Sequence, residues 1–169
     1  MDTFAAVIRA LDTARVRFVV IGVWGANYYA NSASVLFTTL DRDLFLPADP
    51  ENLLNAWSVC DTCGLSLWAG HEPLDTPRDL QLAQAVVERR ALTRGSDDHG
   101  LEIDLSLVMA GFEFADAERD HKIFVVDNVE IPVARLSHIV QSKAAAGREK
   151  DRLFLATHRE ALRDLLDEA

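Results

Sequence analysis

Two aspartates interrupt an otherwise apolar run in the segment T-T-L-D-R-D-L-F-L at residues 38–46. The β-branched and aromatic residues predict a strand over 39–46. Side chains two residues apart project from the same face of a strand, so Asp41 and Asp43 are expected to point together and Arg42 away from them. A carboxylate in an apolar strand raises the free energy of the folded state unless something compensates its charge. The pair therefore predicts a strand with one chemically specialised face.

A second strand carries another carboxylate. The segment L-E-I-D-L-S-L-V at 101–108 alternates between apolar and polar residues and predicts a central strand that contains Asp104. If the two strands are neighbours, three carboxylates meet on one patch and raise one another's pKa. A divalent cation would stabilise such a cluster, and oxygen ligands suit Mg²⁺ or Mn²⁺. The alternative is that a D-x-D pair arises by chance in an aspartate-rich chain.

Composition limits the class of protein. The 169 residues, 49% hydrophobic and 26% charged, predict one globular domain over 1–169, with a core at about 16–134 and C-terminal helices at about 135–166. No apolar run is long enough to cross a bilayer, and the N-terminal segment lacks the apolar core of a secretory signal. A net charge of −10 disfavours broad nucleic-acid binding. We expect a cytoplasmic protein with no membrane partner, whose Cys60 and Cys63 are ordinary thiols.

The remaining patterns predict alternating helices and strands. Phe4, Val7, Ile8 and Leu11 fall on one face of an opening helix. The other expected elements are a strand at 16–22, a short helix at 22–30, a loop at 31–36, a helix from Pro50 to about Cys63, an irregular segment at 65–78, a helix or lid-like insertion at 78–92, a polar loop at 94–100, a hairpin at 122–133 turning at Asp127-Asn128, and helices at 136–146 and 151–166.

The order of these parts resembles the polymerase-β-like nucleotidyltransferase superfamily. The matching motifs are I-G-V-W-G-A, T-T-L-D-R-D-L-F-L, P-E-N-L-L, L-E-I-D-L and S-K-A-A-A-G-R-E-K-D, and the resemblance runs from about residue 16 to 165. It is strongest to a small bacterial branch related to abortive-infection and type IV toxin–antitoxin nucleotidyltransferases. The resemblance implies an α/β (α+β) nucleotidyltransferase fold: a mixed twisted sheet with helices mainly on one face, a C-terminal helical pair and an open cleft over the aspartates.

The resemblance also implies catalytic roles. Asp41 and Asp43 match the pair that holds the metal ions, and Asp104 matches the later carboxylate that acts as general base and metal ligand. Thr39 matches the threonine that commonly precedes the pair. Arg42 departs from the apolar residue usual between the two aspartates, and we expect it to pair with an acid or to extend to the surface.

A nucleotide-binding set follows from the same resemblance. Gly22 matches the first position of a glycine-rich turn that binds the triphosphate at a helix start. Val23 occupies the second position, where the family usually has glycine or serine. Lys143, Arg148 and Lys150 match a basic motif that would neutralise the β- and γ-phosphates. The alternative for the basic residues is an ordinary turn between helices, in which cations complement a helix end.

The function that these expectations favour is Mg²⁺-dependent (or Mn²⁺-dependent) nucleotidyl transfer. A nucleoside monophosphate would pass from an NTP, with ATP the expected one, to a hydroxyl-bearing acceptor, a small molecule, a protein or tRNA, with release of pyrophosphate. The alternative is a catalytically impaired relative that binds nucleotides or proteins, for example as half of a toxin–antitoxin pair. A protein partner would then be antitoxin-like or would supply acceptor binding.

Overall fold

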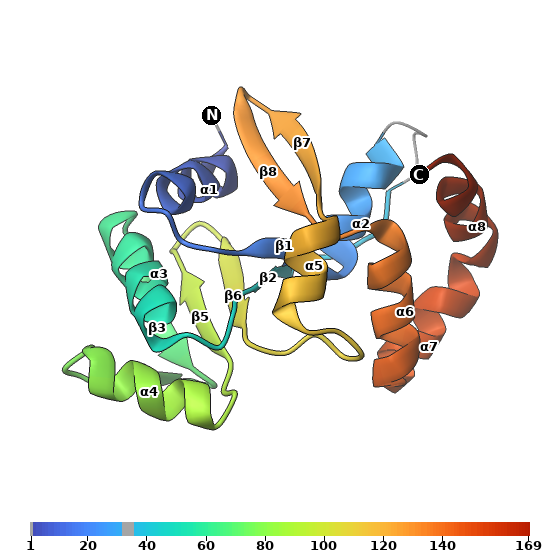
Figure 1. Ribbon diagram of the computed structural model, residues 1–169. Helices are drawn as coiled ribbons and strands as arrows, with labels where there is room; N and C mark the ends of the chain where they lie inside the picture. The colour runs from blue at the N-terminus through green and yellow to red at the C-terminus, as the bar shows by residue number, and fades with distance from the viewer. Residues whose placement is uncertain (1, 32–35) are drawn as a thin grey trace.

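The computed structural model in Figure 1 describes residues 2–31 and 36–169, so most of the loop expected at 31–36 lies outside the described residues. Its helices are α1 (Thr3–Thr13), α2 (Gly22–Ala30), α3 (Pro50–Thr62), α4 (Leu80–Glu88), α5 (Phe114–Asp120), α6 (Leu136–Ala146), α7 (Glu149–Thr157) and α8 (Arg159–Glu168). Its strands are β1 (Val19–Ile21), β2 (Arg42–Phe45), β3 (Ser66–Ala69), β4 (Glu72–Pro73), β5 (Thr93–Ser96), β6 (Glu102–Ser106), β7 (Lys122–Val126) and β8 (Val129–Val133).

These strands form one mixed sheet in the order β4-β3-β5-β6-β2-β1-β8-β7. The central strand β2 runs parallel to β6 and antiparallel to β1. Figure 1 shows the C-terminal helices α6, α7 and α8 gathered at one end of the molecule and α3 and α4 at the other. The α/β class and the mixed sheet are therefore confirmed.

The register of the central strands sorts their side chains between two faces. Asp43 pairs with Asp104, and Leu44 pairs with Leu105 on the neighbouring position. Because successive side chains alternate, the two aspartates share one face and the two leucines share the other. Both leucines are fully buried. The apolar face thus anchors the strands and leaves the opposite face free for polar groups.

Helices pack on both faces of the sheet. Trp57 of α3 donates a hydrogen bond from its indole Nε1 to Thr93 Oγ1 of β5 at 3.1 Å. From α2, the ring of Trp24 packs under the guanidinium of Arg42, which projects from the same face as Leu44. On the aspartate face, α5 covers one end, where the ring of Phe114 meets Phe45 edge-on at 5.4 Å.

Several elements form where the local pattern predicts them. In α1, Phe4, Val7, Ile8 and Leu11 are all buried. The backbone at Asp127 and Asn128 has positive φ values of 52° and 63°, which is typical of the tight hairpin turn expected there. No helix in the described ranges is long and apolar enough to cross a membrane.

Two segments expected to be irregular are strands instead. Residues 65–78 contain β3 and β4, which pair antiparallel, and the polar loop expected at 94–100 begins inside β5. Hydrogen bonding to β3 on one side and β6 on the other holds β5, although T-R-G-S has little intrinsic strand preference. Gly95 suits this strand because a Cβ there would lie 3.2 Å from Leu65 Cδ1. Of the two alternatives for 78–92, the structure forms a helix, α4.

The prediction of one continuous helix over 151–166 is also wrong, because the segment is divided into α7 and α8 at His158. His158 leaves the helical conformation, with φ −109° and ψ 21°. Its ring packs against the rings of Phe37 and Phe154, with centroids 4.8 and 4.9 Å away. This packing is specific to the tertiary structure, so the continuous periodicity of the sequence does not reveal the break.

The hydrogen bond between Trp57 and Thr93 gives a stability prediction. Thr93→Val keeps the shape of the side chain but leaves a buried indole N–H without an acceptor, since both residues are 1% exposed. We expect the free energy of unfolding, measured by urea denaturation, to fall by about 1–3 kcal/mol. Thr62→Val at the exposed end of α3 is the control and should change it by less than about 0.5 kcal/mol. Equal stabilities of the two variants would contradict the prediction.

Candidate functional site

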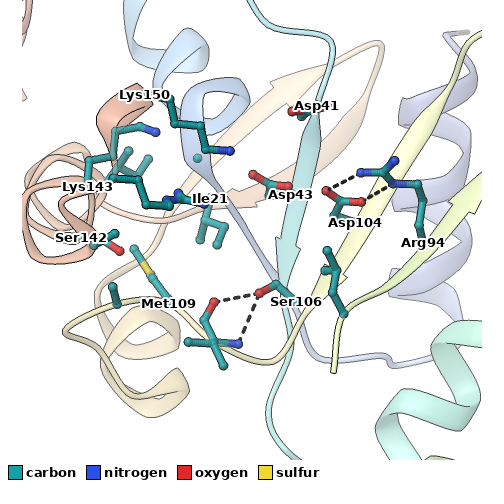
Figure 2. Close-up of a pocket in the computed structure, with 17 residues that line it drawn as sticks. Ile21, Asp41, Asp43, Arg94, Asp104, Ser106, Met109, Ser142, Lys143 and Lys150 are labelled. Atoms are coloured by element: carbon teal, nitrogen blue, oxygen red, sulfur yellow. Dashed lines mark hydrogen bonds and ion pairs between the residues drawn. The ribbon is translucent and has the colours of Figure 1, made fainter. Parts of the chain in front are cut away.

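A pocket of about 560 Å³ lies over the aspartate face of the sheet. It brings together most of the residues that the sequence singles out: Gly22, Asp41, Asp43, Asp104, Lys143, Arg148 and Lys150. Figure 2 shows Asp43 between Asp104 on one side and Lys143 and Lys150 on the other. Val23 and Thr39 do not line this pocket. Acidic and basic groups from distant parts of the chain therefore face the same space.

Asp43 and Asp104 form the acidic side. They are direct partners on the parallel strands β2 and β6. Burial raises the pKa of Asp43 to about 7, and the charge of Asp104, a hydrogen bond with it and the charge of Asp41 all act in the same direction. Lys143 opposes the rise. A second positive charge would favour the ionised form of Asp43 at neutral pH.

Asp41 lies at the rim of the pocket. It is exposed and precedes β2, which begins at Arg42 rather than at residue 39 as expected. The Asp41 backbone N–H donates to Thr39 Oγ1 at 3.1 Å. Thr39 thus shapes the backbone just before the strand, and Asp41 has more freedom than Asp43 to adjust to a ligand.

The turn from β1 into α2 comes close to the acidic side. Gly22 begins α2 with a φ of +72°, and a Cβ at this position would lie 2.6 Å from Asp43 Oδ2. Only glycine therefore fits both the backbone conformation and the space. The free N–H groups at a helix start favour an anionic ligand. Val23, the next residue, packs its half-buried side chain against the hydrophobic core.

The basic side is organised by Asp151, whose side chain is fully buried. Its carboxylate accepts from Arg148 Nε at 2.7 Å and lies 3.5 Å from Lys143 Nζ. Burial alone would raise the pKa of Asp151, but Arg148 and Lys143 outweigh it and lower the pKa. Burial also lowers the pKa of Lys143, which Asp151 counteracts. Among the described residues, exposed Lys150 has no ion-pair partner and is free to meet a ligand.

Arg94 is the site residue that the sequence does not indicate. Its Nε donates to Asp104 Oδ1 at 2.6 Å and its Nη2 to Oδ2 at 3.3 Å (Figure 2). Its Nη1 lies 3.4 Å from Glu102 Oε2. Arg94 therefore compensates the charge of Asp104 within the protein itself. The residue falls in the segment expected to be a loop, and only the pairing of β5 with β6 places it here.

Arg42 points away from the pocket, as the alternation predicts. Its guanidinium carbon lies 4.0 Å from the ring centre of Trp24 and 5.6 Å from that of Phe4. A guanidinium stacks well on an aromatic face, and this contact takes the place of the ion pair or surface position expected from the sequence. Arg42 is therefore a cation that packs on aromatic rings at this position of β2.

The donor set suits a hard divalent cation in part. Asp43 and Asp104 provide carboxylate oxygens in register, and Asp41 adds another at the rim. Within residues 2–31 and 36–169, no three His, Cys, Asp or Glu side chains are arranged closely enough to hold a metal ion. Both oxygens of Asp104 are engaged by Arg94. Two adjacent carboxylates are thus preformed, and full coordination would require Arg94 to move.

Comparison of the chain with protein-family models and with curated proteins gave no match. The geometry and charge of the pocket are therefore the indications of function in this chain.

The contact between Gly22 and Asp43 predicts a difference between two glycine substitutions. Gly22→Ala and Gly70→Ala both place a Cβ at positive φ, which costs about 1–2 kcal/mol of stability, but no atom lies within 4 Å of the new Cβ at Gly70. Gly22→Ala must also displace the Asp43 carboxylate, for an additional loss of about 0.5–1.5 kcal/mol. Urea denaturation measures both. If Gly22→Ala proves at least as stable as Gly70→Ala, then Gly22 does not lie in close contact with Asp43.

The raised pKa of Asp43 predicts a pH-dependent gain in stability for Asp43→Asn. Above pH 7, wild-type Asp43 is ionised in both states, and its ionised form is disfavoured by folding. Asparagine removes this cost and should raise the free energy of unfolding at pH 8 by more than about 1 kcal/mol, because one pKa unit corresponds to about 1.4 kcal/mol. The gain should shrink as the pH falls toward 4, where wild-type Asp43 is protonated in the folded state and increasingly so in the unfolded state.

Urea denaturation between pH 4.5 and pH 8 measures this gain. Exposed Asp98→Asn is the matched control and should show no comparable pH-dependent difference from wild type. If Asp43→Asn is less stable than wild type at pH 8, then the pocket does not destabilise the ionised carboxylate of Asp43.

Proposed function

We propose that this protein is a divalent-metal-dependent nucleotidyltransferase. It would transfer a nucleoside monophosphate from an NTP, with ATP the expected substrate, to a hydroxyl-bearing acceptor and release pyrophosphate. The observation that carries the proposal is the pairing of Asp43 with Asp104 on one side of a pocket whose other side presents Lys143, Arg148 and Lys150.

The two sides of the pocket favour a ligand that carries both signs of charge. A free anion would be attracted by the lysines and repelled by the aspartates, and a free cation would experience the reverse. A metal–triphosphate complex satisfies both sides at once. The volume of about 560 Å³ lies within the range of roughly 300–1,000 Å³ common for small-molecule sites.

Each group in the pocket has a role in this reaction. Asp41, Asp43 and Asp104 would hold Mg²⁺ or Mn²⁺, which when bound neutralises phosphate charge and favours ionisation of the acceptor hydroxyl. Asp104 would accept the hydroxyl proton. The acceptor oxygen then forms a bond to the α-phosphorus while the bond to the β-phosphate oxygen breaks.

The groups opposite the aspartates would act on the leaving pyrophosphate. Lys143 and Arg148 are held in place by Asp151, and Lys150 is free to contact phosphate oxygens. The start of α2 at Gly22 adds backbone N–H groups beside Asp43. Catalysis would therefore consist mainly of positioning and charge neutralisation.

One observation favours a second function. Arg94 engages both oxygens of Asp104, the residue proposed as general base. If this ion pair is permanent, the pocket would bind a nucleotide without catalysing transfer. The chain would then act as a nucleotide-binding or protein-interaction module, for example as half of a toxin–antitoxin pair with an antitoxin-like partner.

Nucleotide binding gives the first prediction from the proposed function. Wild type should bind ATP in the presence of Mg²⁺ in a calorimetric titration, and Lys150→Gln should bind it about tenfold more weakly because a charge-assisted phosphate contact is lost. Lys122→Gln removes a lysine from β7, outside the pocket, and should bind like wild type. No heat of binding in wild type, or equal affinities of the two variants, would contradict the proposal.

Labelled ATP then separates catalysis from binding alone. Label in the α-phosphate should transfer to an acceptor in a cell extract, label in the γ-phosphate should leave in pyrophosphate, and Asp43→Asn should abolish transfer. Binding of ATP without transfer of the α-label would favour the second function.

A further inference from the structure

Arg94 has two acidic partners on the same strand. Asp104 and Glu102 are two residues apart on β6, so both project from the aspartate face. Arg94 is the direct cross-strand partner of Asp104. Its Nε lies 2.6 Å from Asp104 Oδ1, and its Nη1 lies 3.4 Å from Glu102 Oε2. The guanidinium can therefore shift its contacts from one carboxylate to the other with the backbone in place.

The two partners differ in exposure. The Asp104 side chain is 12% exposed, whereas that of Glu102 is 47% exposed and that of Arg94 is 36% exposed. Asp104 lines the pocket beside Asp43, and Glu102 does not line it. A move toward Glu102 would thus take the guanidinium out of the acidic cluster and free both oxygens of Asp104.

The position of Arg94 is also where a divalent cation would act. Its charge compensates Asp104 at hydrogen-bond distance and also interacts with the charge of Asp41. A metal ion would compete with the guanidinium for the oxygens of Asp104, and two positive charges at such short range repel. Arg94 therefore opposes the binding of a bare cation in this arrangement.

We propose that Arg94 is a positioning residue that takes the place of the metal ion beside Asp104. It holds Asp104 until a divalent cation binds and displaces the Arg94 guanidinium toward Glu102. This inference rests on the proposed function and deepens it, because it states how the metal enters. A bare cation would bind weakly, since it must displace Arg94 without help. The cation would bind well only together with a triphosphate, whose negative charge offsets the repulsion and which Lys143, Arg148 and Lys150 attract.

The test measures Mn²⁺ binding to the full chain in the absence of nucleotide. The electron paramagnetic resonance signal of free Mn²⁺ reports how much of the metal is bound. Arg94→Gln should bind Mn²⁺ about tenfold more tightly than wild type, because the competing cation is gone. Glu102→Gln should bind it several-fold more weakly, because Arg94 loses its alternative partner. Arg17→Gln breaks the remote ion pair of Arg17 with Glu118, 2.8 Å in length, and should bind like wild type.

A double variant shows whether Glu102 acts by receiving Arg94 or only by attracting cations with its negative charge. If Glu102 acts by receiving Arg94, then Glu102→Gln should have no further effect on Mn²⁺ affinity once Arg94→Gln is present. If Glu102 only attracts cations, its substitution should weaken Mn²⁺ binding equally in both backgrounds, and this result would overturn the exchange between partners. Arg94→Lys, which keeps the charge, provides a variant if Arg94→Gln does not fold, and its affinity should lie between those of wild type and Arg94→Gln.

The outcomes distinguish this inference from the proposed function. Equal Mn²⁺ affinity of wild type, Arg94→Gln and Arg94→Lys would overturn the role of Arg94 and leave the proposed metal site standing. Absence of Mn²⁺ binding in every variant would overturn both, because the pocket would then take no cation even with its internal competitor removed.

Discussion

The pairing of β2 with β6 is the constraint on which the site depends. It places Asp43 directly beside Asp104, while Leu44 and Leu105 on the reverse face are fully buried. Burial of the leucines fixes the register, since a shift of one residue would turn apolar side chains to the pocket and carboxylates to the core. The folding free energy of the apolar face therefore sustains an arrangement of acids that is unfavourable by itself, as the raised pKa of Asp43 indicates.

Charge in the pocket is compensated locally on each side. Arg94 pairs with Asp104, and buried Asp151 holds Lys143 and Arg148. In both cases, the charged side chains are held in place by their ion-pair partners before any ligand binds. This preorganisation lowers the cost of binding a ligand that carries charges of both signs. The contacts with Asp151 explain how an acidic chain can hold Lys143 and Arg148 toward the pocket that Lys150 also lines.

Sequence patterns predict the parts of this structure that depend on local order. The alternation around Asp43 and Asp104 predicts two strands and a shared face, and Gly22 predicts the turn beside them. Patterns fail where partners distant in sequence decide the conformation. The residues of β5 show no strand pattern and form a strand because β3 and β6 hydrogen bond to them, so Arg94 could not be placed beside Asp104. His158 likewise ends a helix where its ring packs against Phe37. Because Phe37 lies far from residues 151–166 in the sequence, the apolar periodicity of that segment does not reveal the break.

A crystal structure with Mn²⁺ and a non-hydrolysable ATP analogue, in which anomalous scattering locates the metal, would show directly whether the pocket binds both. We expect an anomalous peak bound by Asp43 and Asp104, a triphosphate directed toward Lys143, Arg148 and Lys150, and Arg94 no longer in contact with both oxygens of Asp104. A nucleotide bound elsewhere, or no metal peak with Arg94 still on Asp104, would contradict this expectation.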